Sequence, residues 1–347
     1  MSAQIKSSAP PAALGPLQWL KKNLFSTWFN TILTLISLGV IYFALKGILH
    51  WVFVTANWDP VAQSLKKFAV GLYPVEEIWR IGTILAMVSF LAGVSWGVWR
   101  GTVRTFALAL AAGFIVIAVL PFDLYPPNGD PLDLLVRVGF IVLPVLIALG
   151  FLLGWKVPIK GSLVLLLWLL SFFLALILLS GFRGSELLPQ VSTNDWSGLL
   201  LTFLLALVGI VASFPIGVAL ALGRQSRLPV VKVFCTLFIE MVRGVPLVTI
   251  LFMASIILPL FLPEEIRIDR VLRAMIGMTL FAAAYMAENV RGGLQAIPRG
   301  QYEAAQAVGL TGFQTTAFIV LPQALRAVIP AIVGQFIALF MDTTLAI

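Results

Sequence analysis

Long apolar runs separated by short polar connections recur along the whole chain. The hydrocarbon core of a membrane needs about 20 apolar residues per helix. Nine runs come close to that length: 28–49, 82–99, 105–121, 137–154, 161–180, 198–222, 245–262, 272–290 and 323–347. Because lipid offers no partner to a free backbone amide, each run is predicted to be a helix. The pattern predicts an all-α integral membrane protein with about nine transmembrane helices.

The runs fall into two parts of different polarity. After a tail over residues 1–22, residues 23–190 form a predicted transmembrane extension of five spans with few polar residues inside them. The polar connection RGSELLPQVSTNDWSG (183–198) marks a boundary. Residues 195–347 carry more charge near their spans and are expected to hold the function. The last run stops inside an apolar stretch, which favours a truncated chain.

Composition agrees with a membrane location and narrows the classes of function. The chain is 60% hydrophobic and 11% charged, whereas soluble proteins carry about 25% charged residues. The net charge of +8 would suit nucleic acid, but the charges lie in the short connections between spans. A single cysteine (Cys235) and a single histidine (His50) predict neither an internal disulfide nor a zinc site.

The distribution of positive charge predicts an orientation. If the N-terminus is cytoplasmic and each span crosses once, the inner side holds 14 of the 23 Lys and Arg residues but only three of the 15 acidic residues. Such an excess of Lys and Arg is typical of cytoplasmic loops. The N-terminus and the loop 291–321 are therefore expected to be cytoplasmic.

That loop contains the stretch EAAQAVGLTGFQTTAFIVLP, which begins at Glu303. Pro298 suits the first turn of a helix, and Gly309 suits its end. Thr311 and Gln314 have the spacing of a capping box, which predicts a second helix directly after the turn. Pro322 is expected to end that helix or to kink the entry into the next span. An alternative is an amphipathic helix resting on the lipid surface.

Several charged residues lie close to the predicted spans. Glu240 and Arg243 are three apart and can form a structural ion pair. Glu288 lies at the inner end of its span, one helical turn from Arg291. It is a candidate for the translocation path, and the alternatives are a salt bridge with Arg291 or a side chain that snorkels from the helix end.

Asp342 lies within the last run, and two hydroxyl residues, Thr343 and Thr344, follow it. A carboxylate in lipid is costly unless it faces protein or water, so these three residues are candidates for the translocation path. A position at the outer rim of a short span is the alternative.

Small residues recur at every fourth position in two spans: Gly93, Gly97 and Gly101, and Gly209, Ser213 and Gly217. Such stripes let helices approach closely. Packing within the chain explains both stripes. For the stripe of Gly209, Ser213 and Gly217, contact with a partner permease is the alternative.

The EAAQAVG…FIVLP stretch resembles the EAA motif of ABC-importer permease subunits. EMVRGVPLVT (240–249) and AAYMAENVRGGLQAIPRGQYEAA (283–305) are similar to permeases of the polar amino-acid (histidine/glutamine/arginine) type. The resemblance covers residues 195–347, and the family core would have one more span. The five-span extension resembles the larger subunits of general or neutral amino-acid importers.

The resemblance implies a role for the motif and a set of partners. Glu303, Ala304, Ala305 and Gly309 would form the contact with a separate ATP-binding subunit, which holds the ATP and magnesium. A second related permease, a periplasmic binding protein and an amino acid would complete the system, in a bacterial inner membrane.

Two other classes of membrane protein remain as alternatives. One is a secondary transporter of small polar solutes driven by an ion gradient, and the other is a scaffold without transport. The sequence contains no G-x-x-x-x-G-K-[ST] phosphate loop, so the chain is not expected to hydrolyse ATP itself. It also has no pattern typical of a metal site or of a hydrolase nucleophile.

Overall fold

The computed structural model describes residues 15–62, 64–120, 131–261, 263 and 268–346. Within these residues, eight helices are long and apolar enough to cross a membrane. A bent pair of shorter helices brings the total to nine if it counts as one span. The predicted all-helical membrane fold is confirmed.

The chain divides into two compact units, Met1–Val61 and Ala62–Ile347. The first unit contains α1 (Pro16–Asn23), α2 (Trp28–His50) and the π-helical segment η1 (Trp51–Thr55). The Thr27 side chain caps α2 by accepting a hydrogen bond of 3.2 Å from the backbone N–H of Asn30. The predicted functional boundary near residue 190 stays a prediction.

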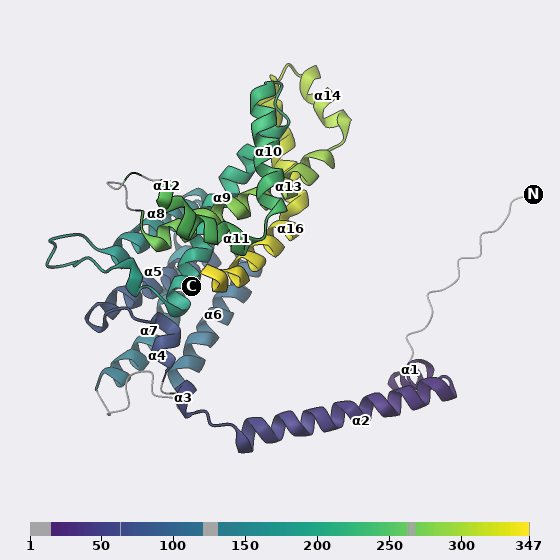
Figure 1. Cartoon of the computed structure of the whole chain (residues 1–347), viewed down its shortest axis with the longest axis vertical. Helices are drawn as coiled ribbons and strands as arrows, with labels where there is room; N and C mark the ends of the chain where they lie inside the picture. The colour runs from purple at the N-terminus through teal and green to yellow at the C-terminus, as the bar shows by residue number, and fades with distance from the viewer. Residues whose placement is uncertain (1–14, 63, 121–130, 262, 264–267, 347) are drawn as a thin grey trace, which may run out of the picture. The chain divides into compact units, whose positions relative to one another are not determined.

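The boundary between the units falls within the short helix α3 (Asp59–Ala62). The second unit continues with the short elements α4 (Leu65–Val70) and η2 (Val75–Glu77) and then contains four long helices (Figure 1). The long helices are α5 (Ile78–Trp99), α6 (Thr102–Val119), α7 (Pro131–Lys156) and α8 (Gly161–Ser180).

Helices α5 and α7 approach so closely that their backbones touch at glycines. A Cβ atom added at Gly93 would lie 2.0 Å from the carbonyl oxygen of Ile147, and one added at Gly150 would lie 2.2 Å from that of Phe90. Gly97 is equally confined by α7. Gly101 lies beyond the contact, and no atom of another element lies within 4 Å of its added Cβ. Two of the three predicted small residues therefore explain the packing of α5 on α7.

Buried polar groups tie the start of α5 to the connection after α8. The Arg80 side chain is fully buried; it pairs with Glu77 at 2.7 Å and donates to the carbonyl of Pro189 at 2.9 Å. The Tyr73 hydroxyl donates to the carbonyl of Leu179 at 3.2 Å. The backbone N–H of Leu72 donates to the Ser197 hydroxyl, 2.9 Å away. The polar connection of residues 183–198 is thus an ordered junction.

The remaining helices form the part of the second unit that carries the predicted function. In chain order they are η3 (Thr193–Asp195), α9 (Gly198–Arg224), α10 (Pro229–Gly244), α11 (Leu247–Phe252), η4 (Met253–Ile257), α12 (Leu258–Phe261), α13 (Arg270–Gln295), α14 (Arg299–Ala307), α15 (Gly312–Gln314), η5 (Thr315–Val320), α16 (Leu321–Asp342) and η6 (Thr343–Ala346). Helix α13 is the most buried of the eight single-helix spans among the described residues. In its 18-residue apolar stretch, 61% of the residues are buried inside the protein.

The second stripe of small residues packs α9 against α13 and α16. An added Cβ at Gly209 would lie 2.9 Å from the Leu339 side chain, and one at Gly217 would lie 2.6 Å from Met286. Ser213 is buried between them. These three residues therefore pack helices of this chain against one another. The alternative, in which the stripe faces a partner subunit, is wrong.

Two details of the predicted helices differ in the structure. The run 245–262 forms α11, η4 and α12, which bend by 106° from α10 at the break after Gly244. Pro322 does not end its helix, because residues Gly312–Leu345 continue as one helix. The π-helical segment η5 precedes Pro322, and the Leu321 N–H donates to the carbonyl of Thr316 five residues earlier. This wider turn absorbs the proline without a break.

Candidate functional site

The predicted helix–turn–helix is present and spans residues 299–314, hereafter the EAA segment. It follows the last turn of α13 at one end of the second unit (Figure 1). Pro298 precedes α14 as its N-cap, with φ of −60°. Thr311 and Gln314 form the predicted capping box: the Gln314 N–H donates to the Thr311 hydroxyl at 3.3 Å, and the Thr311 N–H donates to the Gln314 side chain at 2.9 Å.

Gly309 makes the turn between the two helices of the EAA segment. Its φ is +80°, in the left-handed region that residues with a Cβ avoid. The Leu310 N–H donates to the Ala305 carbonyl at 3.1 Å, and the Gly309 N–H donates to that of Gln306 at 2.9 Å. These bonds close the end of α14 in the manner typical of a glycine C-cap. The sequence prediction for Gly309 is confirmed in its backbone geometry.

The inner face of the EAA segment fastens it to the protein. Ala305 is only 4% exposed, and Tyr302 and Ile297 pack against the buried cluster around Met286. The Gln323 side chain on α16 donates to that of Gln301 at 3.0 Å. The segment is therefore held by α13 and α16.

The outer face of the EAA segment carries the groups that a partner could touch. Glu303 and Ala304 are exposed, and Val308 and Phe313 on either side of the turn are 75% and 80% exposed. Ala305 was expected at this face, but it is buried on the inner side of α14, the side on which Tyr302 packs against the chain's own core. Val308 and Phe313, two large apolar side chains that the sequence prediction did not name, are exposed on this face.

An arginine cluster lies where α9, α10 and α13 meet. Glu288 is at its centre and accepts from Arg291 one turn away at 2.7 Å. Arg224 lies 3.4 Å from the other Glu288 oxygen, and Arg243 lies 3.5 Å from that same oxygen. One carboxylate thus ties three helices together. The predicted salt bridge with Arg291 is present.

Glu240 and Arg243 do not pair with each other among the described ion pairs. Glu240 accepts from Arg224 on α9 at 3.0 Å, whereas Arg243 reaches Glu288 on α13. Arg243 also lies over the Tyr285 ring, 5.2 Å from its centre. Both side chains bridge helices, and partners on other helices displaced the predicted contact within α10. The sequence prediction did not name Arg224 as a partner of Glu240 and Glu288, because Arg224 is distant from both in the sequence.

The predicted path residues differ in their surroundings. Asp342 ends α16, and the described ion pairs include none with it. Thr343 is fully buried and its hydroxyl donates to the Phe340 carbonyl at 2.8 Å, while the exposed Thr344 donates to that of Met341 at 3.1 Å. Glu288 is engaged in the arginine cluster instead. Of the two carboxylates predicted for the path, Asp342 is therefore the one without an ion pair among the described residues.

In the described part of the chain, no three His, Cys, Asp or Glu residues lie together as a metal site would require. Cys235 is buried in α10 as a free thiol.

Comparison with known proteins gives matches along nearly the whole chain. Residues 213–347 match the family described as "Binding-protein-dependent transport system inner membrane component". The chain is 36% identical over 344 residues to the Escherichia coli inner membrane amino-acid ABC transporter permease protein YhdY. That match covers 95% of this chain and 78% of the relative.

Two further relatives differ in how much of the chain they match. The Rhodobacter capsulatus glutamate/glutamine/aspartate/asparagine transport system permease protein BztC is 37% identical, covering 97% of this chain and 82% of its own length. The Bacillus subtilis probable glutamine ABC transporter permease protein GlnP is 38% identical over 152 residues, which is 44% of this chain and 68% of that protein. Similarity to the long relatives therefore includes the N-terminal spans.

Proposed function

The chain belongs to the permeases of amino-acid ABC transporters, and on this premise we propose that its EAA segment couples solute passage to a separate ATPase. The chain is the inner-membrane permease component of a binding-protein-dependent amino-acid transporter. It is not itself catalytic, and the family implies that a partner hydrolyses ATP. ATP and magnesium would be held by that partner.

The outer face of the EAA segment carries the proposal. It combines a carboxylate at Glu303 with the exposed apolar side chains of Val308 and Phe313 around a fixed turn. A rigid element with an exposed apolar patch is suited to protein contact. The inner face lies against α13 and α16 through Tyr302, which packs on their buried cluster, and through the hydrogen bond between Gln323 and Gln301. Displacement of the segment by an ATPase would therefore act directly on two spans.

The arginine cluster would carry such a displacement to further helices. Glu288 lies less than two turns before the end of α13, from which the EAA segment continues. Its ion pairs reach α9 through Arg224 and α10 through Arg243. A ligand-driven switch needs elements that move together and differ in affinity between two states. We assign the cluster the role of keeping these helix ends together.

The wider arrangement follows from the charge distribution and the family. The N-terminus and the loop 291–321 would be cytoplasmic, supported by the excess of Lys and Arg on that side. Residues 195–347 would form the permease core and residues 23–190 an extension, supported by the family match to residues 213–347. A second related permease subunit would complete the solute path. The binding protein would deliver the amino acid from the periplasmic side.

Reconstituted uptake tests this function. The natural full-length chain would be placed in proteoliposomes with its candidate partner permease, ATPase and binding protein. Uptake of labelled amino acids should require ATP and every partner. Uptake that persists without ATP but stops when an ion gradient is collapsed would overturn the proposal.

Asp342 is proposed to face the solute path and to attract the ammonium group of the amino acid. Asp342→Asn is expected to lower uptake on the order of tenfold, because a hydrogen bond to a charged group contributes about 1.5–3 kcal/mol. The control is Glu186→Gln, which removes an exposed carboxylate from the connection after α8. Equal uptake by Asp342→Asn and wild type would place Asp342 outside the path.

A further inference from the structure

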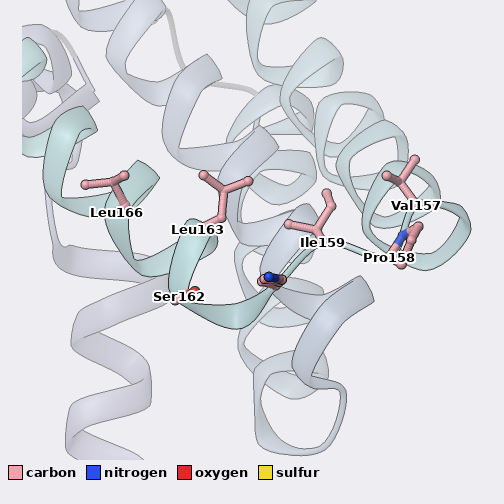
Figure 2. A pocket seen from close by; sticks show the side chains of 7 residues that line it. Val157, Pro158, Ile159, Ser162, Leu163 and Leu166 are labelled. Carbon is pink, nitrogen blue, oxygen red and sulfur yellow. The ribbon is translucent and has the colours of Figure 1, made fainter.

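A groove lies where the chain passes from α7 to α8 in the N-terminal extension. Its volume is about 480 Å³, and it is open to the surroundings. Figure 2 shows four apolar side chains in a row along it: Val157, Ile159, Leu163 and Leu166. Lys160 and Ser162 add an ammonium group and a hydroxyl at the start of α8. The groove therefore combines an apolar wall with one cationic group.

The surroundings of the groove are positively charged. Lys156 ends α7, and Arg100 and Arg104 lie in and after the connection from α5 to α6. The two connections are neighbours, since a Cβ added at Gly161 would lie 2.9 Å from the Trp99 indole nitrogen. The described ion pairs include none with these arginines or lysines.

Acidic residues are absent from the sequence on both sides of this region. No Asp or Glu occurs in residues 78–122 or in residues 134–185. Lys160 lines the groove, and Lys156, Arg100 and Arg104 lie in or next to the two neighbouring connections. The two stretches that carry these four cations thus supply no acidic residue to balance them. An anion from outside the chain would supply the missing charge.

The groove also lies at the level where a helix leaves the membrane. It joins the ends of two predicted spans, Leu134–Lys156 and Gly161–Ser180. Trp99 and Trp155 are exposed beside it, and tryptophan is enriched at the membrane–water boundary. A ligand here would have its polar part in the headgroup layer and its apolar part in the hydrocarbon.

We propose that this groove binds an anionic phospholipid. The phosphate would lie between Lys156 and Lys160, near the N-terminal end of α8, where backbone N–H groups favour an anion. An acyl chain would lie along Leu163 and Leu166. Basic pockets between spans on the cytoplasmic side are suited to anionic headgroups. The proposal uses the placement of the spans and does not depend on the proposed ATPase coupling.

Lipid titration of the purified full chain tests this site. The chain in detergent would be titrated with phosphatidylglycerol, and bound lipid would be counted by native mass spectrometry. The double variant Lys156→Gln/Lys160→Gln is expected to weaken binding roughly 25-fold, since each surface lysine contributes on the order of fivefold. The matched control Lys21→Gln/Lys22→Gln removes the same charge from α1, and its binding should stay within about twofold of wild type.

Further arms decide between the possible results. Lys160→Arg keeps the charge and should retain binding, which separates loss of charge from misfolding. Three results would each overturn the proposal. They are equal retention of neutral phosphatidylcholine, an equal loss of binding in the α1 control, and no phosphatidylglycerol binding by wild type. Displacement by millimolar glycerol phosphate would also overturn it, because the site would then recognise a free phosphate. Resistance to that competitor supports a lipid.

Discussion

Replacing Gly309 by Val is expected to lower ATP-driven uptake about tenfold while the chain still inserts and assembles. The φ of Gly309 is +80°, and a side chain with a Cβ in this region costs about 1–2 kcal/mol. No atom of another segment lies within 4 Å of an added Cβ, so the Cβ itself meets no neighbouring element. The backbone strain is therefore in the turn itself. We expect the turn to open and to move Val308 away from Phe313. The measurement is uptake per assembled transporter in proteoliposomes.

Two variants of the same segment make this result interpretable. Gly309→Asn should retain most of the uptake, because asparagine tolerates the left-handed region. Gly300→Ala adds the same Cβ inside α14, at a position with open space and ordinary helical backbone. It should leave uptake unchanged. Normal uptake by Gly309→Val would show that the turn does not transmit the ATPase signal.

Gly93→Leu is expected to prevent stable packing of the N-terminal extension. The added Cβ alone would lie 2.0 Å from the Ile147 carbonyl oxygen and 2.9 Å from the backbone nitrogen of Phe151. Backbone atoms of a helix cannot turn aside, so α5 and α7 must separate. Overpacking costs about 1–3 kcal/mol and occasionally more, and this contact belongs at the upper end. The fraction that stays monodisperse after heating in detergent should fall sharply.

The same helix supplies a control for this variant. Gly82 also lies in α5, and nothing lies within 4 Å of an added Cβ there. Gly82→Leu should therefore behave like wild type in the heating experiment. If Gly93→Leu were as heat-resistant as Gly82→Leu, the close approach of α5 and α7 would be wrong.

Features with a local physical cause could be predicted from the sequence. The apolar runs located the spans because length and hydropathy alone determine whether a helix can cross lipid. Gly309 and the Thr311–Gln314 capping box were predicted because a left-handed turn and a cap depend on residues a few positions apart. The stripe at Gly93 and Gly97 likewise indicated close packing, although its partner α7 was not predicted.

Features that depend on distant partners could not be predicted in this way. Helical spacing groups Tyr302 with Ala305, but it does not say whether that face meets a partner or the chain's own core. Glu240 and Arg243 have the right spacing to pair, yet Arg224 and Glu288 on other helices engage them.

The geometry at helix breaks could not be predicted from the sequence either. Gly244 and Pro246 indicate that α10 ends before the next run, but the 106° angle depends on how both helices pack. Pro322 usually favours a kink. Here the π-helical turn before it accommodates the ring, and the hydrophobic pattern carries no sign of that turn.

The most direct test of the account is whether the ATPase covers the EAA segment. The chain has one native cysteine, Cys235, and it is buried, so a cysteine introduced at Val308 can be labelled selectively with a maleimide. Leu187→Cys, exposed in the connection after α8, is the control. In the complex of permeases and ATPase, labelling at position 308 should slow at least about tenfold relative to the free chain, because a covered thiolate cannot reach the reagent. Labelling at position 187 should not change. Equally fast labelling at position 308 with and without the ATPase would contradict the proposed coupling.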